Sequence, residues 1–423
     1  MRSAATSRRL HSKQTIAYCA AFVALGLTYA PLGPTLTNLA ENTSTNLDQI
    51  SVIFSARGFG YLIGSVVGGY LYDRLRGNPI VIGAMLLSGV MLSLIPTIPI
   101  LWILVIAVFL LGAFQGALDV GGNTLLVWVH GESVSPFMNA MHFFFGVGAF
   151  LSPVIVAQAL TRTGNVQWAF WSLALLVLPV VIGLAGLPSP SPEDADDISH
   201  DPSERPSSEH AGENRGASSN LVLPLIVLFF FMYVGAESGY SGWIATYAKA
   251  TALGGAATAA YLTSAFWIAI TMGRLLSIPL AAHVKPEGVL FFDLIGAVLS
   301  MALPTVWPDS SIAIWAGTIG VGLFMASMFP TMVSYAERQL TVTGRVTSWY
   351  FVGGSLGGMT LPLVIGQLFE SFGPRIMIYG IGINLILAFV VFAGLFGLVR
   401  QRHRERHPLA PQRGRKRSRN DVL

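Results

Sequence analysis

The stretch LWILVIAVFLLGAFQGALDVGGNTLLVWV, residues 101–129, contains one charged side chain, Asp119, in an otherwise apolar run. About 20 consecutive apolar residues are enough for an α-helix to cross the ~30 Å hydrocarbon core of a bilayer. Because the backbone must satisfy its own hydrogen bonds in lipid, such runs cross as helices. The stretch therefore predicts a transmembrane helix with a carboxylate inside it.

The composition of the whole chain extends this prediction beyond one helix. Of the 423 residues, 53% are hydrophobic and 11% are charged, and the mean hydropathy is +0.62. Soluble domains carry about 25% charged residues, so we predict an all-α polytopic membrane protein. Twelve apolar segments are expected to span the membrane, at residues 14–37, 50–72, 79–99, 101–129, 136–160, 166–187, 221–247, 257–281, 287–306, 311–336, 344–369 and 374–399.

The composition changes between the sixth and seventh segments. The sequence PSPSPEDADDISHDPSERPSSEHAGENRG, which starts at residue 188, holds eight acidic and two basic residues. Such a polar composition is typical of a disordered linker. The predicted parts of the chain are a tail at 1–13, a six-helix bundle at 14–187, an acidic linker at 188–220, a second six-helix bundle at 221–399 and a basic tail at 400–423.

The distribution of lysine and arginine predicts the orientation in the membrane. If both termini are cytosolic, 20 of the 25 Lys and Arg residues lie in cytosolic tails and loops and three in outer loops. The other two, Arg57 and Arg274, lie inside apolar segments. Cytosolic termini in a plasma or cell membrane are therefore expected. We expect the basic tail at 400–423 to contact anionic lipid headgroups, or to act only as a topology anchor, and not to bind nucleic acid.

The two halves of the chain contain an internal repeat. Glycine, proline and glutamine positions recur at an offset of 209 residues, as Gly26 and Gly235, Gly33 and Gly242, Gly148 and Gly357, Pro153 and Pro362, and Gln158 and Gln367. Two repeats of six helices with a binding site between them are a common plan of secondary transporters. The repeat therefore favours a transporter over an enzyme.

The loop between the second and third segments reads GGYLYDRLRGNP, residues 68–79. Gly69, Leu71, Asp73 and Arg74 match the signature Gly-x-Leu-Ala-Asp-Arg-x-Gly-Arg, so the loop resembles that of the major facilitator superfamily, with the second glycine one position late. The resemblance implies two pseudo-symmetric six-helix bundles. We expect Asp73 and Arg74 to latch one half of the protein onto its neighbour; the alternative is an ordinary loop with positive-inside charge.

Asp119 forms part of a polar stripe on its helix. Gln115, Asp119 and Asn123 are spaced four residues apart, so they project from one face with a slow drift. A charge near the bilayer centre costs about 2.5–3.5 kcal/mol on insertion scales. We expect the stripe to bind a hydroxylated solute; the alternative is a structural pair between Asp119 and Arg57.

The seventh segment, GAESGYSGWIATY at 235–247, predicts the second part of the solute site. Glu237 would accept hydrogen bonds from hydroxyl groups, and Tyr240 and Trp243 would cover apolar C–H faces. The alternative for Trp243 is a place in an interfacial aromatic belt. Arg274, in the next segment, would either meet Glu237 or latch onto a cytosolic half-helix. His142, near the cytosolic start of the fifth segment, is either a proton-coupling residue or a structural one.

Further stretches narrow the resemblance. The helix with Asp119 and Asn123, HFFFGVGAFLSP at 142–153, GAESGYSGWIATY at 235–247 and TYAPLGPTLTNLA at 28–40 resemble the fucose-permease and sodium-dependent-glucose-transporter branch of the superfamily. The resemblance implies a sugar substrate. Fucose permease has an aspartate within its first helix, whereas residues 16–40 here contain no acidic residue. A coupling role therefore cannot be transferred to that helix, and Asp119 is the candidate.

These observations predict a secondary active transporter that moves a small polar solute, a hexose or related sugar, by alternating access. Proton symport is the working hypothesis: a low-dielectric site disfavours the charged form of Asp119, and protonation would let the site reorient. The alternatives are sodium-coupled transport, uniport, a drug or metabolite exporter of the same fold, and a nutrient receptor that does not transport. A monomer is expected.

An enzyme is not predicted. The sequence contains no nucleophile–base pair, no metal-ligand cluster and no phosphate-binding loop that we can identify. We therefore expect no cofactor and no bound metal beyond a coupling ion, H⁺ or Na⁺.

Overall fold

A computed structural model describes residues 2–191, 221–340 and 344–406. The elements are α1 (Arg2–Tyr29), α2 (Leu32–Asn42), α3 (Leu47–Ile50), α4 (Val52–Tyr72), α5 (Gly77–Leu94), η1 (Ile95–Thr97), α6 (Leu101–His130), η2 (Gly131–Ser133), α7 (Ser135–Thr163), α8 (Gln167–Ala185), α10 (Val222–Ala250), α11 (Ala256–His283), α12 (Pro286–Val306), α13 (Ser311–Met325), α14 (Met328–Glu337), α15 (Gly344–Phe372) and α16 (Ile376–Arg406). Most of the predicted linker and basic tail, at 192–220 and 407–423, lies outside the described residues.

The all-helical membrane fold is confirmed. Within the described residues, eleven helical stretches are long and apolar enough to cross a membrane, and the bent pair Arg9–Tyr29 and Leu32–Asn42 provides a twelfth. Each of the twelve predicted segments corresponds to one of these spans.

Two of the predicted segments are broken rather than continuous. The first, predicted at 14–37, divides into α1 and α2 with a bend of 41°. Pro31 lies at this break, and proline has no N–H and disfavours the helical conformation of the residue before it. The tenth span divides between α13 and α14. Pro330 lies in the first turn of α14, where it cannot donate to the carbonyl of Ala326 in a continuous helix.

The internal repeat corresponds to equivalent helix crossings in the two halves. A Cβ atom at Gly26 of α1 would collide with the backbone of α7, and one at Gly148 of α7 would collide with the backbone of α1. The repeat partners behave in the same way, because Gly235 of α10 and Gly357 of α15 face one another's helices. Small residues let membrane helices approach closely, so the repeated glycines fix the same packing twice.

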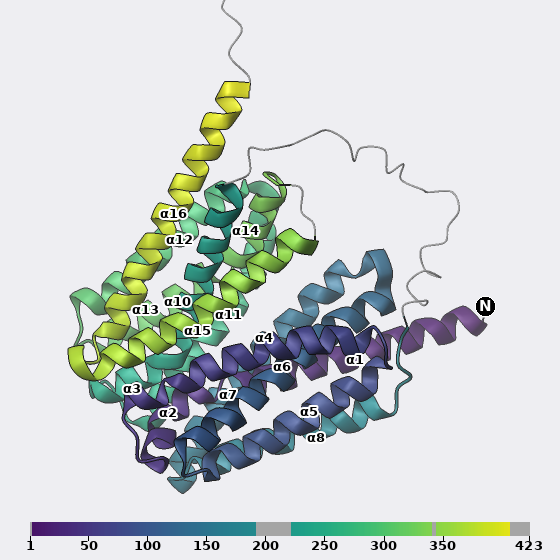
Figure 1. Ribbon diagram of the computed structural model, residues 1–423, viewed down its shortest axis with the longest axis horizontal. Coiled ribbons are helices and arrows are strands. Elements are labelled where there is room, and N and C mark those ends of the chain that lie inside the picture. Colours follow the sequence, from purple (N-terminus) through teal and green to yellow (C-terminus); the bar gives the residue numbers. More distant parts are fainter. Residues whose placement is uncertain (1, 192–220, 341–343, 407–423) are drawn as a thin grey trace, which may run out of the picture.

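The two halves form a V whose arms meet at one end (Figure 1). The first half contributes α2, α3, α4 and α7 to this contact, and the second half contributes α10, α11 and α15. Gly33 of α2 lies against the backbone of Gly242 of α10, its partner in the repeat. Contact between two equivalent positions places the pseudo-two-fold axis between them. We call this joined end, at which α2 and α3 lie, the closed end.

Polar contacts between the halves seal the closed end. Lys249 of α10 donates from Nζ to Thr37 Oγ1 at 2.8 Å and to the carbonyl of Pro34 at 3.3 Å, both in α2. Gln367 of α15 donates to the carbonyl of Asp48 at 2.7 Å. The arms separate toward the opposite end, where α1 begins and α16 ends (Figure 1). We call this the open end of the V.

The predicted latch residues lie at the open end and contact their own half. Asp73 is the C-cap residue of α4 and is exposed. The guanidinium carbon of Arg74 lies 4.0 Å from the centroid of the Tyr70 ring, one turn earlier in α4. The latch between the halves therefore stays a prediction, for a state in which this end is closed.

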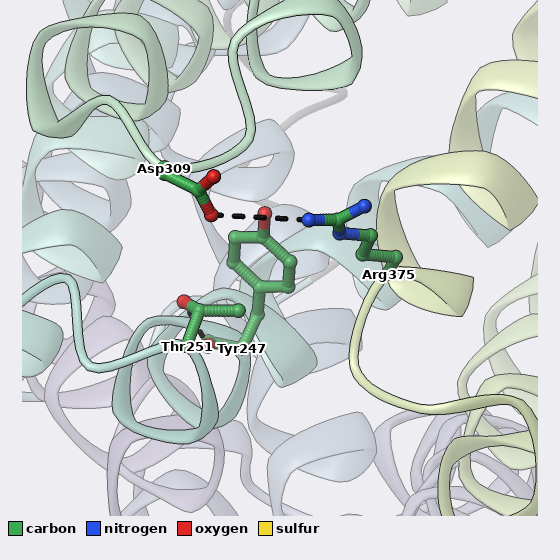
Figure 2. A network of polar contacts seen from close by, with 4 residues as sticks. All are labelled: Tyr247, Thr251, Asp309 and Arg375. Carbon is green, nitrogen blue, oxygen red and sulfur yellow. Dashed lines mark hydrogen bonds and ion pairs between the residues drawn. The ribbon is translucent and has the colours of Figure 1, made fainter.

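A second polar cluster ties loop ends together at the closed end of the second half. Arg375 Nη2, before α16, lies 3.8 Å from Asp309 Oδ1, before α13. Figure 2 shows the side chain of Tyr247, from α10, pointing toward this pair, and its hydroxyl lies within electrostatic range of both charged groups. The side chains of Arg375 and Asp309 are 51% and 94% exposed, so this pair contributes little to stability.

Candidate functional site

A cavity of about 270 Å³ lies between the two halves. Its lining comes from α1, α4, α6 and α7 of the first half and α10, α11, α14 and α15 of the second. The volume is close to the lower end of the roughly 300–1,000 Å³ that small-molecule pockets occupy. The site is therefore large enough for one small solute that touches both halves.

Ten of the 22 residues that line the cavity are aromatic, and five carry acidic or basic side chains. Arg57, Asp119 and His142 come from the first half, and Glu237 and Arg274 come from the second. The aromatic lining residues are Phe22, Tyr29, Phe54, Tyr61, Phe145, Tyr233, Trp267, Phe329, Tyr350 and Phe351. All five acidic and basic groups were identified as site or gating candidates from the sequence, and the fold brings them to one cavity.

Asp119 is held by a network of hydrogen bonds within the first half. The hydroxyl of Tyr61, in α4, donates to Asp119 Oδ2. Asn123 Nδ2 donates to Asp119 Oδ1 at 3.1 Å, and His142 Nε2 donates to Asn123 Oδ1 at 3.2 Å. Asn123 thus connects the carboxylate to the imidazole. Both carboxylate oxygens have a donor, which compensates for the removal of the charge from water.

Arg57 is not paired with Asp119 in the described structure, although both line the cavity. Its Nη1 donates to the carbonyl of Tyr29 at 2.8 Å, where α1 ends. The guanidinium carbon lies 4.0 Å from the centroid of the Tyr29 ring, a cation–π distance. Arg57 therefore provides a positive charge at the negative C-terminal end of α1.

The second half contributes its own cluster of opposite charges. Glu237 of α10 and Arg274 of α11 both line the cavity, and both lie within electrostatic range of Tyr233. His142 lies within electrostatic range of Arg274 across the cavity, as well as of Asp119. The imidazole is therefore placed between the charges of the two halves.

Three predicted ligand residues lie outside the cavity wall. Gln115 is fully buried and donates to the carbonyl of Thr28 at 3.0 Å. Tyr240 is paired with Thr318 at 2.8 Å, and Trp243 Nε1 donates to the carbonyl of Pro362 at 2.9 Å.

The reason for this placement is helix geometry. Four residues advance a helix by slightly more than one turn, so Gln115 drifts from the face of Asp119 toward α1. Tyr240 stacks on Phe266 within the second half, and Trp243 stacks on Phe369 of the same half. The Trp243 ring also lies 6.0 Å from that of Phe54, so it packs behind the wall of the cavity. We therefore assign none of the three to the solute site. Asn123 is not in the wall either, but it contacts Asp119 and His142, which are.

Two important wall residues, Tyr61 and Trp267, were not identified from the sequence. Tyr61 follows Arg57 by four residues, and Trp267 precedes Arg274 by seven. Both spacings place the aromatic side chain on the helix face of the arginine. Their spacing from Arg57 and Arg274 could therefore have identified these two aromatic residues from the sequence.

Comparisons with known proteins agree with this architecture. The family model of the Major Facilitator Superfamily matches residues 16–351. The sodium-dependent glucose transporter 1A of Mus musculus is 31% identical over 381 residues, which cover 82% of this chain and 88% of that protein. The major facilitator superfamily domain-containing protein 4A of Danio rerio is 28% identical, over 94% of this chain and 90% of that protein.

Solved structures support the fold independently. The nucleoside transporter NupG, in the form of a point mutant, superimposes with a TM-score of 0.71 at 14% identity, over 92% of this chain and all of that chain. The tetrameric protein PepTSo2 gives 0.70 at 13% identity, over 93% and 99%. With a family model that matches most of its length, this chain belongs to the Major Facilitator Superfamily of transporters.

Proposed function

We propose that the protein is a secondary active transporter that moves a small polyhydroxylated solute, a hexose or related sugar, by alternating access. The observation that supports this most directly is the cavity between two pseudo-symmetric halves, which are joined by polar contacts at one end and diverge toward the other (Figure 1). Rocking of the halves about such a site is the usual mechanism of alternating access.

The lining favours a neutral polar solute. Two guanidinium groups and two carboxylates line the cavity, so their formal charges cancel when both carboxylates are ionised. A net charge on the solute would disturb this balance. Aromatic rings cover the apolar faces of a solute while buried polar groups orient its hydroxyls. The relatives named as glucose transporters support the same solute class.

Proton coupling is the mechanism that we propose for Asp119. The chain of Tyr61, Asp119, Asn123 and His142 joins a carboxylate and an imidazole, two side-chain types that act as proton donors and acceptors in proteins. Protonation of Asp119 would change the charge balance of the cavity by one. That change would alter the relative stability of the two open states, which is what coupling requires.

Sodium coupling is a second candidate because of the names of the relatives. Several relatives are called sodium-dependent glucose transporters. Sodium would require several oxygen ligands at one position, whereas both oxygens of Asp119 already accept hydrogen bonds. The hydrogen-bonded network therefore favours the proton in this chain. Uniport, with Asp119 serving only to bind the solute, is the third option.

We further propose that both termini are cytosolic and that the membrane is a plasma or cell membrane, because of the positive-inside distribution. The open end of the V would then face the cytosol. The basic tail would contact anionic lipid headgroups; its residues 407–423 lie outside the described part. A single chain contains the whole cavity, so a monomer is sufficient for transport.

The decisive experiment is counterflow in proteoliposomes with labelled hexoses, deoxyhexoses and amino acids, repeated with imposed proton and sodium gradients. Counterflow of a sugar that is accelerated by a proton gradient is the expected result. In Asp119→Asn, gradient-driven accumulation should be lost. Asp309→Asn is the matched control, because this carboxylate is 94% exposed and lies outside the cavity wall.

Each other outcome selects a different function. Acceleration by sodium alone, or full pH dependence in Asp119→Asn, would refute proton coupling at this residue. Counterflow that responds to neither ion would indicate uniport. Counterflow of lipophilic solutes only would indicate an exporter, and binding without counterflow of any solute would indicate a receptor.

A further inference from the structure

A second, much smaller space lies beside the central cavity, next to Gly33 and Gly242 of the closed end; because it adjoins the cavity, we call it the extension. This space has a volume of about 10 Å³, close to the minimum that holds one water molecule. Tyr29, Arg57, Ser238 and Trp267 border both the main cavity and this extension. The extension therefore has room for one oxygen atom of a solute that occupies the main cavity.

Trp267, which borders this space, carries an unused hydrogen-bond donor. The residue is 2% exposed, and its Nε1 has no hydrogen-bond partner in the described structure. Its ring is held edge-to-face against Tyr29 and Phe145, with centroid distances of 5.9 and 6.0 Å. A buried indole N–H usually has a partner, and leaving a buried donor unpaired is costly. The unpaired donor indicates a partner that is supplied by a ligand.

Arg57 adds donors to the same space. A guanidinium carries five N–H groups, of which Nη1 donates to the carbonyl of Tyr29. Arg57 and Trp267 are donors only, so the group that they share must be a hydrogen-bond acceptor. Arg57 lies in the first half of the protein and Trp267 in the second. One acceptor oxygen at this point would therefore contact both halves.

We propose that this extension is a subsite for one hydroxyl oxygen of the solute, with the indole N–H of Trp267 as its donor. The proposal rests on the proposed transport of a polyhydroxylated solute and adds a specificity rule to it. The solute must carry a hydroxyl group at the position that reaches the closed end. A monodeoxy analogue that lacks this hydroxyl would leave the donor unpaired.

The test compares one sugar with its monodeoxy analogues in the same proteoliposome preparation. The sugar is the one that shows counterflow with the unmodified protein. Because a buried donor loses its acceptor, the half-saturation concentration for one monodeoxy analogue should be higher than that for the parent sugar by about tenfold or more. Trp267→Phe keeps an aromatic ring and removes the N–H. It should therefore raise the half-saturation concentration for the parent sugar and abolish the discrimination against that analogue.

Trp243→Phe is the matched control. It removes an N–H in the same half that is already paired with the carbonyl of Pro362. Trp243 is not in the cavity wall, and because Phe keeps a ring at this position, the contact with Phe54 of the wall is retained. This variant should keep the discrimination of the unmodified protein. The ratio between two sugars does not depend on how much protein is correctly folded, so a loss of expression cannot imitate the expected result.

Three outcomes would overturn the subsite. Equal half-saturation of the unmodified protein for the parent and every monodeoxy analogue would do so without any variant. Unchanged discrimination in Trp267→Phe would show that water alone fills the space. Equal loss of discrimination in Trp243→Phe would assign it to packing. Transport of no sugar at all would instead refute the proposed function, which separates the two failures.

Discussion

Removal of the Lys249 ammonium should open the closed end. Lys249 of α10 donates to Thr37 Oγ1 at 2.8 Å and to the carbonyl of Pro34 at 3.3 Å. Both acceptors lie in α2 of the other half, so these bonds must break when the halves separate at this end. Lys249→Met keeps most of the aliphatic length of the side chain and removes the donors.

The magnitude follows from the number and exposure of these bonds. Hydrogen bonds to a charged group contribute about 1.5–3 kcal/mol, but Lys249 is only partly buried, which lowers the value through solvent screening. A loss of about 1.4 kcal/mol is a reasonable estimate, and it corresponds to a tenfold change in an equilibrium constant. We therefore expect the ratio of molecules whose halves are separated at this end to molecules whose halves are joined there to rise about tenfold.

Spin labels at the closed end would measure this ratio. Cys19 is the one cysteine of the chain and is buried, so Cys19→Ser gives a background for labelling. Nitroxides at Ile100→Cys and Trp307→Cys occupy exposed positions in loops of the two halves. The population at the longer inter-label distance should grow in Lys249→Met. Lys285→Met, which removes an exposed lysine before α12, is the control.

The reasoning would be refuted by an unchanged distance distribution in Lys249→Met. It would also fail if Lys285→Met produced the same change, because the effect would then follow from net charge and not from the contact with α2.

Two stability predictions concern polar contacts away from the cavity. Asn78 is 2% exposed, and its side chain makes three hydrogen bonds: it donates to two backbone carbonyls beyond the end of α8 and accepts from Tyr18. Because a hydrogen bond in a membrane protein contributes about 0.6 kcal/mol, Asn78→Ala should lower the unfolding free energy by about 2 kcal/mol. A midpoint of thermal unfolding no lower than that of Asn384→Ala, which removes a single bond to the carbonyl of Met232, would contradict this value. Asp309→Asn breaks the exposed pair with Arg375 (Figure 2) and should change the unfolding free energy by less than about 1 kcal/mol; a larger loss would show that the pair is coupled to other contacts.

The fold could be predicted from the sequence because the bilayer imposes its own length scale. Each apolar segment had to span the hydrocarbon core as a helix, and the 209-residue offset related the halves before any contact was known. The break in the first span has a clear local cause in Pro31. Its consequence was not predictable, because the position of α2 against α10 depends on Gly33 and Gly242, which are 209 residues apart.

The cavity was only partly predictable, since residue type and spacing do not determine which face of a helix meets the cavity. Asp119 and Glu237 were identified because a carboxylate inside a membrane-spanning segment is energetically costly and usually has a function. Gln115 satisfied the same pattern but is used in packing against Thr28. Trp267 resembles any buried aromatic residue in sequence, and only its unpaired Nε1 distinguishes it in the structure.

The arrangement along α4 gives the site and the seal a common mechanical element. Tyr61 donates to Asp119, and Arg57, one turn earlier on the same face, donates to Tyr29 at the bend between α1 and α2. Residues of α2 in turn accept the bonds of Lys249. A change of charge at Asp119 therefore acts on a helix that also holds the bend next to the seal. Because Ser55 of α4 donates to the carbonyl of Met359 in α15 at 2.8 Å, the same helix contacts the other half directly. A rigid helix with these contacts can bias the opening of the closed end without any movement of the solute itself.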